Sequence, residues 1–425
     1  MPEEKPFGEK LRIDLKVGFF LAKRDIRRAN IWTTALIIFV MTLTFLNLVV
    51  VSGILVGLIE GSVEANKKVS TGDVIITPFL NRPFIDNTQW VASIAREVPG
   101  FEKMTIRYSG GGRVESNYKE TVKRGDLRDG AGAQVLGIEP EVEENFSGIS
   151  KFLIEGEYLT KEDSEWVMLG KNLLYKYTPI EAPGFQTLKD VKIGSKVQVT
   201  VGDIQKEYFV KGIIGSKVDA FDTSVVMTDT EARKILGRGD YNANQISVRL
   251  DSGSDPVLAK NSLIASGAGD YGRVQTSTEA EPKFLKDIKV TFAILGNAIS
   301  SIGLVVGGIT IFIVIFVNAI TRRRFIGILK GIGISNRAIS FSYVIQSLFF
   351  AGAGIIVGGI LVFALIKPAL DANPIDFPFS DGILVAKFGE TSVRALILFL
   401  ATAVAGYIPA RIVVKQNTLS AILGR

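Results

Sequence analysis

Four long apolar segments determine what this chain can fold into. They cover residues 30–60, 290–321, 338–366 and 391–410, and each is almost free of charged side chains. A helix of about 20 residues crosses the hydrocarbon of a bilayer, and the first three segments are longer than that. We therefore predict an α-helical membrane protein with four transmembrane helices, of which the first three tilt or project beyond the membrane. The fourth is shorter, and Arg394 near its start is expected to snorkel to the outer interface.

Lysine and arginine are concentrated beside these segments in three stretches of the chain. They precede the first segment, fill residues 322–337 between the second and third, and recur after the fourth in residues 411–425. With four spans, all these stretches fall on one side, and the positive-inside rule makes that side cytoplasmic. We therefore predict a multi-pass protein of the cell (cytoplasmic) membrane with both termini in the cytoplasm. No basic stripe carries interleaved aromatic residues, so nucleic acid is not an expected partner.

The N-terminal stretch 1–29 is amphipathic. Leu11, Leu15, Ala22 and Ile26 recur at helical spacing, and lysine and arginine occupy the other positions. This pattern predicts an interfacial helix on anionic headgroups, which makes membrane lipid a partner. The alternative is a merely solvated charged leader, and the regular apolar stripe argues against it. The stretch is too long and too charged for a cleaved signal peptide.

A large soluble region, residues 61–289, separates the first two segments. By the predicted topology it is extracytoplasmic, and its mixed texture predicts a large α+β domain of two lobes with a boundary near Ser150. The glycine-rich stretches 110–112 and 130–132 predict turns, and Gly202-Asp203 predicts a hairpin. Strands are expected at 73–78, 135–138, 197–201, 208–214, 225–227 and 246–250, and helices at 87–98 and 229–236. Residues 367–390 are expected to form an outer loop.

The composition excludes several chemistries. The chain has no histidine and no cysteine, which removes thiol nucleophiles, disulfides and the usual zinc ligands. No Gly-x-x-x-x-Gly-Lys-Ser/Thr motif is present, so any nucleotide energy must come from another chain. The acidic run 139–144 is typical of a solvated face, and no metal site or catalytic residue is predicted. We therefore expect no enzyme activity and no cofactor in this chain.

The membrane segments themselves carry little that could move ions. Almost no ionisable residue lies within them, which argues against a proton- or ion-coupled carrier. The pairs Gly303-x-x-x-Gly307 and Gly354-x-x-x-Gly358 allow helices to approach closely. Packing within one chain and a seam between two subunits explain these pairs equally well.

The loop between the second and third segments carries the strongest functional signal. A basic triplet precedes an amphipathic Ile/Leu/Gly helix, which cannot lie in hydrocarbon but can lie on the membrane surface and dock on a soluble partner. The candidate site residues of this coupling helix, within residues 322–337, are Arg322, Arg323, Arg324, Phe325, Ile326, Gly327, Leu329, Lys330 and Gly333.

This loop resembles the sequence Arg-x-Arg-x-Glu-Ile-Gly-x-Leu-Lys-Ala-Leu-Gly found in permease subunits of ABC transporters of the MacB, LolC/LolE and FtsX type. The family's closing motif is matched by Pro409, Ala410 and Arg411, and its short terminal helix by residues 419–423. Segments of the inserted region also resemble the MacB-like periplasmic domain in the same order, among them 73–76, 135–140 and 193–197. Phe325 stands where the family usually has glutamate, which puts a polar contact of that position in doubt.

The resemblance implies a permease that works with other subunits. It would pair with a second copy or a paralogue, and two ABC ATPase subunits would bind the ATP and magnesium. The helix around Ile326 to Lys330 would sit in a groove of the ATPase, and ATP-driven motion would reach the extracytoplasmic domain by mechanotransmission. A charge at Ile326 or Gly327 would then uncouple the ATPase and leave folding intact.

The resemblance leaves the biological role open. Export or extraction of lipoproteins, peptides or amphipathic compounds is one possibility, with a periplasmic adaptor or another extracytoplasmic protein as a further partner. The alternative is an FtsX-like regulator that activates an extracytoplasmic cell-wall hydrolase, although such proteins usually have a smaller extracytoplasmic domain. An adhesin or sensor without an ATPase would leave the coupling loop without a purpose.

Overall fold

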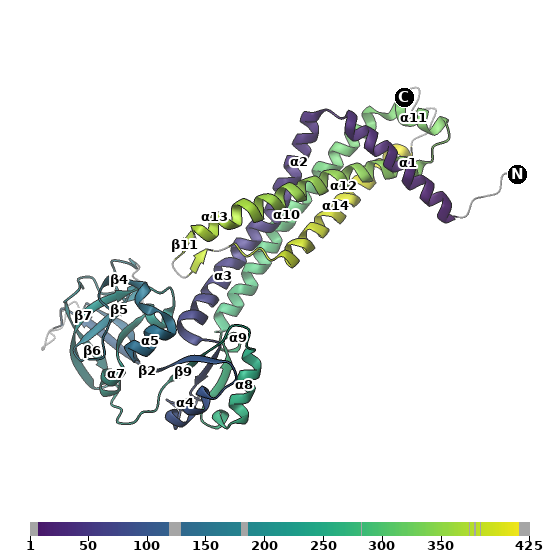
Figure 1. Ribbon diagram of the computed structural model, residues 1–425. Helices are drawn as coiled ribbons and strands as arrows, with labels where there is room; N and C mark the ends of the chain where they lie inside the picture. Colours follow the sequence, from purple (N-terminus) through teal and green to yellow (C-terminus); the bar gives the residue numbers. More distant parts are fainter. Residues whose placement is uncertain are drawn as a thin grey trace. The chain divides into compact units, whose positions relative to one another are not determined.

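The computed structural model describes residues 7–118, 129–179, 186–281, 283–373, 375–377, 380–382 and 384–415 (Figure 1). The chain divides into two compact units. The membrane unit comprises Met1–Glu60, Asp287–Asp376 and Asp381–Arg425. The inserted domain comprises Gly61–Lys286 and Phe377–Ser380.

Four helices in the described part of the chain are long and apolar enough to cross a membrane, which confirms the predicted number. They cover Ile31–Thr71, Leu285–Thr321, Asn336–Ala372 and Phe388–Val414. The first consists of α2 (Ile31–Leu46), η1 (Asn47–Val51), α3 (Ser52–Asn66) and η2 (Lys67–Thr71). The others are α10 (Lys283–Thr321), α12 (Asn336–Ile360) with η6 (Leu361–Ile366) and α13 (Lys367–Ala372), and α14 (Phe388–Val414). The inserted domain lies between the first and second of these helices in the sequence, as predicted.

Part of the predicted outer loop 367–390 is helical. The third membrane helix continues through α13 to Ala372, and α14 starts at Phe388. The two short strands β11 (Ile375–Phe377) and β12 (Ser380–Gly382) pair between them. The loop prediction therefore missed one extra helical turn or more at the end of the third span.

The glycine pairs in the membrane helices pack within the chain. A Cβ atom on Gly354 would lie 2.6 Å from Met41 Cβ, and one on Gly358 would lie 2.5 Å from a ring carbon of Phe45. Gly303 and Gly307 contact Asn47 and Thr44 of the first helix in the same way. Both pairs therefore allow α12 and α10 to pack closely against the first membrane helix. This observation favours packing within one chain over a seam between subunits.

We expect Gly354→Val to lower the free energy of unfolding of the membrane unit by about 1–3 kcal/mol, because the added atoms would collide with the backbone of α2. The matched control is Gly359→Val on the same helix, where nothing lies within 4 Å of the added Cβ. Thermal unfolding in detergent, followed by circular dichroism, compares the two. Equal losses in both variants would mean that helix propensity, and not packing, causes the effect.

The helix α1 (Phe7–Arg28) lies against α12 in the membrane unit. A Cβ on Gly18 would meet the Ala338 carbonyl oxygen at 2.9 Å, and Leu21 and Ala22 are buried. The predicted amphipathic helix is therefore present, and its small residues press on α12 while its basic residues remain largely exposed.

Arg394, which is predicted to snorkel to the outer interface, contacts the first membrane helix. Its guanidinium donates to Ser52 Oγ at 2.8 Å and lies 3.5 Å from the carbonyl oxygen of Val49. Val49 belongs to η1, a π-helical turn whose altered ladder leaves carbonyl groups open to other donors. Polar groups of the first membrane helix therefore accept hydrogen bonds from the charged Arg394 side chain.

The inserted domain is built on a sheet of ten strands in the order β10-β1-β9-β2-β3-β8-β5-β7-β4, with β6 paired to β2 and β7. The pairs β3–β8 and β5–β7 are parallel and the others antiparallel. The strands are β1 (Val74–Thr77), β2 (Phe101–Ser116), β3 (Asp129–Ile138), β4 (Leu153–Gly156), β5 (Trp166–Gly170), β6 (Lys196–Val201), β7 (Ile204–Ile214), β8 (Ser224–Thr228), β9 (Gln245–Leu250) and β10 (Arg273–Thr276). The domain is thus α+β, as predicted.

Short helices cover this sheet, and α4 and α8 flank β9 (Figure 1). They are α4 (Thr88–Arg96), α5 (Pro140–Ser147), η3 (Ile149–Phe152), η4 (Lys171–Leu173), α6 (Asp219–Asp222), α7 (Asp229–Ile235), α8 (Pro256–Ala265), η5 (Ala268–Asp270) and α9 (Ser277–Ala280). Local capping explains several of their starts. Asp255 accepts a hydrogen bond from the Val257 amide at the start of α8, and Thr276 forms a capping box with Glu279.

The glycine-rich stretches are strands and not turns. Residues 110–112 lie in β2 and residues 130–132 in β3, and the two strands pair with Gly110 opposite Val135 and Arg113 opposite Gly132. A Cβ on Gly112 would lie 2.8 Å from the Thr200 carbonyl oxygen, so glycine there allows β6 to approach closely. The turn prediction failed because glycine marks close backbone contact as well as turns. The predicted hairpin is correct, with Val201 opposite Ile204.

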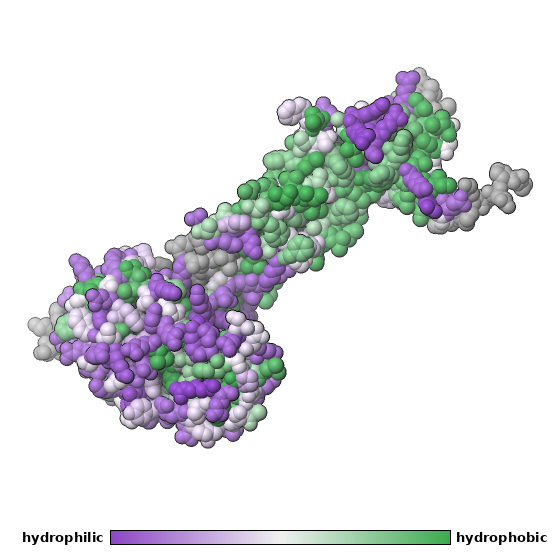
Figure 2. All heavy atoms as spheres, viewed as in Figure 1, coloured by the Kyte–Doolittle hydropathy of each residue, from purple (hydrophilic) through white to green (hydrophobic). Residues whose placement is uncertain are grey.

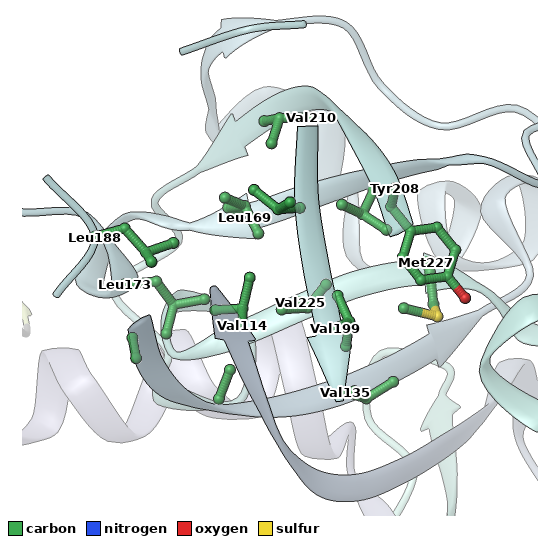
Figure 3. Packing of buried hydrophobic residues seen from close by; sticks show 14 of the residues in the cluster. Val114, Val135, Leu169, Leu173, Leu188, Val199, Tyr208, Val210, Val225 and Met227 are labelled. Atoms are coloured by element: carbon green, nitrogen blue, oxygen red, sulfur yellow. The ribbon is translucent and has the colours of Figure 1, made fainter. Parts of the chain in front are cut away.

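The predicted lobe boundary near Ser150 is wrong. Ile149, beside it, packs in one cluster with Ile138 and Val226, from either side of that position. A second cluster joins Val135 to Val167, again across Ser150; Figure 3 shows these side chains of β2, β3, β5, β6, β7 and β8 pointing toward one another. A third cluster brings Val74 together with Val248, which are far apart in sequence. The sheet joins segments from both ends of the domain, so no cut near residue 150 separates two lobes.

Candidate functional site

The predicted coupling helix corresponds to α11 (Arg323–Gly331). α10 ends at Thr321, Arg322 occupies the N-cap position of α11, and Ile332 follows the last turn of α11. Gly333 has φ +93, in the left-handed region that glycine adopts without strain, and this terminates the helix. Ser335 then caps α12 by accepting a hydrogen bond from the Ala338 amide at 3.0 Å.

One face of α11 packs on its own bundle. Ile326 is only 3% exposed and belongs to a cluster with Tyr343 and Val413, and Gly327 is also buried. Leu329 packs against the same cluster from a partly buried position. Lys330 Nζ donates to the Val414 carbonyl oxygen at 3.0 Å, at the C-terminal end of α14, where a cation is favoured. These residues hold the helix in place.

The opposite face of α11 is apolar and exposed. Phe325, Ile328 and Ile332 are 39%, 48% and 71% exposed. Their spacing of three and four residues places them on one side of the helix and its C-cap. We call these three residues the docking face. Figure 2 shows that hydrophobic and strongly hydrophilic surfaces adjoin at the end of the membrane unit that carries α11.

Of the docking face, only Phe325 is among the coupling residues predicted from the sequence, and Ile328 and Ile332 are not. The sequence also predicts that a charge at Ile326 or Gly327 leaves folding intact. Because the structure buries both of these residues, a charge there would disturb the bundle. Apolar residues occur on both faces of α11, so periodicity alone could find the helix but could not say which face meets the bundle.

An ion pair fixes the start of α11. Arg322 Nη1 donates to Asp25 Oδ1 of α1 at 2.7 Å, and the buried Gln346 of α12 donates to the other Asp25 oxygen at 3.3 Å. One carboxylate therefore joins three helices at the basic end of the unit. Of the other two arginines of the triplet, Arg324 is exposed and Arg323 is half-buried.

The closing motif lies inside α14. Pro409 and Ala410 are buried, and the helix continues past the predicted end of the span at residue 410 to Val414. Arg411 is exposed and its guanidinium lies 5.9 Å from the centroid of the Tyr407 ring. Residues 419–423, which resemble the family's terminal helix, lie outside the described residues.

In the inserted domain, a buried arginine binds the end of the first long helix. Arg107 of β2 and Glu143 of α5 are 1% and 0% exposed. Arg107 Nε and Nη2 donate to the two Glu143 oxygens at 2.9 and 2.7 Å, a bidentate ion pair. The same guanidinium donates to the carbonyl oxygens of Ser70 and Val69 in η2 at 2.6 and 2.8 Å. We call Arg107, Glu143 and these two carbonyls the helix clamp.

Further groups surround the helix clamp. Ser247 Oγ and Gln245 Nε2 of β9 donate to the Ser70 carbonyl oxygen at 2.8 and 3.0 Å. Arg249 donates to the carbonyl oxygens of Lys68 and Phe146. The last carbonyls of a helix have no intrahelical donor and carry partial negative charge, and these two arginines supply both donors and positive charge. The end of the first long helix is thereby part of the core of the inserted domain.

The acidic run 139–144 is in part structural. Glu143 belongs to the helix clamp, and Glu144 accepts hydrogen bonds from the Ser150 amide and hydroxyl at 2.9 and 2.7 Å. Burial, followed by the Glu143 and Glu144 carboxylates, raises the pKa of Tyr158, and the Tyr158 hydroxyl donates to the Pro140 carbonyl oxygen at 2.9 Å. A solvated face was the prediction for this run, and it is wrong for Glu143. No group of three or more acidic residues suited to a metal ion occurs in the described residues.

Comparison with known proteins finds a family model, two curated relatives and a solved structure that resemble parts of this chain. Residues 297–418 match the family model described as FtsX-like permease C-terminal. An uncharacterised ABC transporter permease from Methanocaldococcus jannaschii is 27% identical over 247 residues, which are 56% of this chain and 59% of that protein. The macrolide export ATP-binding/permease protein MacB from Haemophilus ducreyi is 30% identical over 199 residues, which are 45% of this chain and 27% of that protein.

A solved structure also matches. The periplasmic region of MacB from Actinobacillus actinomycetemcomitans aligns with a TM-score of 0.34 and 15% identity, covering 50% of this chain and 92% of that one. The chain spans less than two thirds of the length of the curated relatives that it matches. The resemblance noted in the sequence is confirmed, since the relatives are ABC transporter permeases and the matched family domain includes α11.

Proposed function

We propose that this chain, which carries an FtsX-like permease C-terminal domain, is the membrane subunit of an ABC transporter and is driven by a separate ATPase subunit. The observation that carries the proposal is the docking face: three apolar side chains stand exposed on a helix whose other face is fixed to the membrane bundle. Exposed apolar residues in such an arrangement mark a protein interaction site. The names of the relatives support the same assignment.

In this proposal the partner provides the nucleotide chemistry. ATP and magnesium bind to the ATPase subunit, and Phe325, Ile328 and Ile332 fill a groove on its surface. The Arg322–Asp25 ion pair holds the start of α11 against α1, so that a displacement of α11 moves the helices with it. The basic end of the membrane unit faces the cytoplasm, and a second permease chain completes the assembly.

In this proposal the motion of the membrane helices is passed to the inserted domain. The helix clamp holds η2, the end of the first long helix, within the inserted domain through several hydrogen bonds. Mechanotransmission requires such an attachment, because a loosely bound helix end would absorb the displacement. The work done is export or extraction of lipoproteins, peptides or amphipathic compounds, with a periplasmic adaptor or another extracytoplasmic protein as a further partner.

Co-purification tests the proposal. The full chain is expressed in its host with an affinity tag, extracted in mild detergent, and assayed for a bound ABC ATPase and for ATP hydrolysis. We expect a stable complex whose ATP hydrolysis depends on this chain, and no hydrolysis by the chain alone. If no ATPase binds, or if the isolated chain hydrolyses ATP, the proposed division of labour is wrong.

A further inference from the structure

A basic cleft opens at the end of the membrane unit that also carries α11. Its volume is about 550 Å³, and its walls come from the ends of α1, α12 and α14. Its lining includes three cations and several apolar or aromatic residues beside the polar Asn336 and Ser340. The cations are Arg337, Arg411 and Lys415, and the apolar or aromatic residues include Leu11, Phe341 and Tyr407. Among its described lining residues none is acidic.

The three helices create the cleft because of how they pack. Gly18 and Ala22 bring α1 into close contact with the first turns of α12, while Leu11, two turns earlier on α1, lines the cleft itself. On the other side, α14 continues past Pro409 and carries Arg411 and Lys415 to the rim. Leu11 of α1 thus closes one side of a cleft whose other walls come from α12 and α14.

We propose that this cleft binds one anionic phospholipid of the leaflet that faces the basic end of the membrane unit. Three cations around one space attract a phosphate-bearing headgroup, and basic pockets between membrane helices have this preference. Arg337 and Arg411 are suited to the phosphate because a guanidinium presents two parallel donors to it. The apolar lining of Leu11, Phe341 and Tyr407 is suited to the start of an acyl chain, which free phosphate lacks.

The site is distinct from the docking face. Phe325, Ile328 and Ile332 do not line the cleft, and none of the cations that line it lies on α11. The proposal therefore stands or falls independently of the proposed ATPase partner. A bound lipid would join α1 to the ends of α12 and α14 through contacts that all three helices share.

The experiment is a lipid titration of the full chain followed by native mass spectrometry. The chain is purified in mild detergent and titrated with dioleoyl phosphatidylglycerol or with dioleoyl phosphatidylcholine, which has the same acyl chains and no net charge. The variant Arg337→Gln/Arg411→Gln removes two cations of the cleft. The variant Arg24→Gln/Arg27→Gln removes two exposed cations of α1 that do not line it.

We expect the wild type to bind one phosphatidylglycerol molecule in preference to phosphatidylcholine. The cleft variant should bind phosphatidylglycerol about 30-fold more weakly, since each of the two cations near an anionic lipid contributes about one kcal/mol, and the control should bind it almost as tightly as the wild type. Equal binding of the two lipids by the wild type, or equal losses in the two variants, would overturn the proposal.

Two further measurements complete the test. Inorganic phosphate in tenfold excess over lipid is expected to leave phosphatidylglycerol bound, and displacement by phosphate would overturn the assignment to a lipid. The single variant Lys415→Gln provides a milder change if the double variant unfolds, and we expect it to weaken phosphatidylglycerol binding about fivefold. Unchanged affinity in a folded Lys415→Gln chain would contradict the proposal.

Discussion

Glu143→Ala is expected to lower the free energy of unfolding of the inserted domain by about 3–5 kcal/mol, because it leaves a buried guanidinium without its counter-ion. Both partners of this ion pair are almost completely inaccessible to water. Arg107 would keep its hydrogen bonds to the two η2 carbonyls, but its charge would be uncompensated in a poorly solvated place. Thr105, which donates to the same carboxylate at 2.9 Å, would also lose its acceptor.

Tryptophan fluorescence can follow this domain by itself. Of the three tryptophans in the chain, Trp90 and Trp166 lie in the inserted domain and Trp32 in the membrane unit, so a Trp32→Phe background isolates the signal. Denaturant unfolding of the full chain in detergent then compares Glu143→Ala with Glu207→Ala. The carboxylate of Glu207 pairs with Lys196 on the surface, so its loss should cost far less than the loss of Glu143. A similar effect of both variants would mean that burial does not make the ion pair critical.

A double variant separates the two roles of Arg107. Arg107→Met/Glu143→Leu removes both charges, and replacing a whole buried ion pair by apolar side chains is often neutral. Here the Ser70 and Val69 carbonyls would lose donors as well, so we expect only partial recovery relative to Glu143→Ala. Complete recovery would mean that the bonds from Arg107 to η2 contribute nothing to stability.

The second large effect concerns the docking face. Ile328→Asp is expected to weaken ATPase binding by at least about 30-fold, because a charge would enter the centre of an apolar contact. The chain should keep its thermal stability, since this side chain is about half exposed. Ile326→Asp should instead destabilise the chain itself. The new charge would be buried among Tyr343 and Val413, and the free energy of unfolding of the membrane unit should fall by several kcal/mol.

Thermal unfolding and ATPase pull-down on the same preparations distinguish the two positions. Asn336→Asp is the matched control, because it adds the same charge at an exposed position at the start of α12, where a carboxylate is favoured. It should change neither stability nor binding by much. If Ile328→Asp binds the ATPase as tightly as the wild type, another surface of the chain makes the contact and the docking assignment is wrong.

Much of the architecture could be predicted because it depends on composition over long windows. Twenty or more uncharged residues in a row have few alternatives to a membrane helix. Short apolar runs, together with two alternating segments at 197–201 and 208–214, located six of the ten strands of the sheet in the inserted domain. The errors involve residues with two physical uses. The glycines at 110–112 allow close contact between strands and do not form a turn. Glu143 forms an ion pair with the buried Arg107 and is not exposed to solvent.

The sequence alone determined that this chain has four membrane helices, an α+β insertion after the first, and an amphipathic helix between the second and third, because hydrophobicity and periodicity act locally along the chain. Only the tertiary structure decided which apolar face of α11 remains exposed, that the glycine pairs pack internally, and that Arg107 binds the end of the first long helix. Each of these depends on residues that are distant in sequence, such as Arg107 and Ser70 or Gly354 and Met41. Burial is a property of the packed chain, and no local pattern specifies which of two apolar faces is covered.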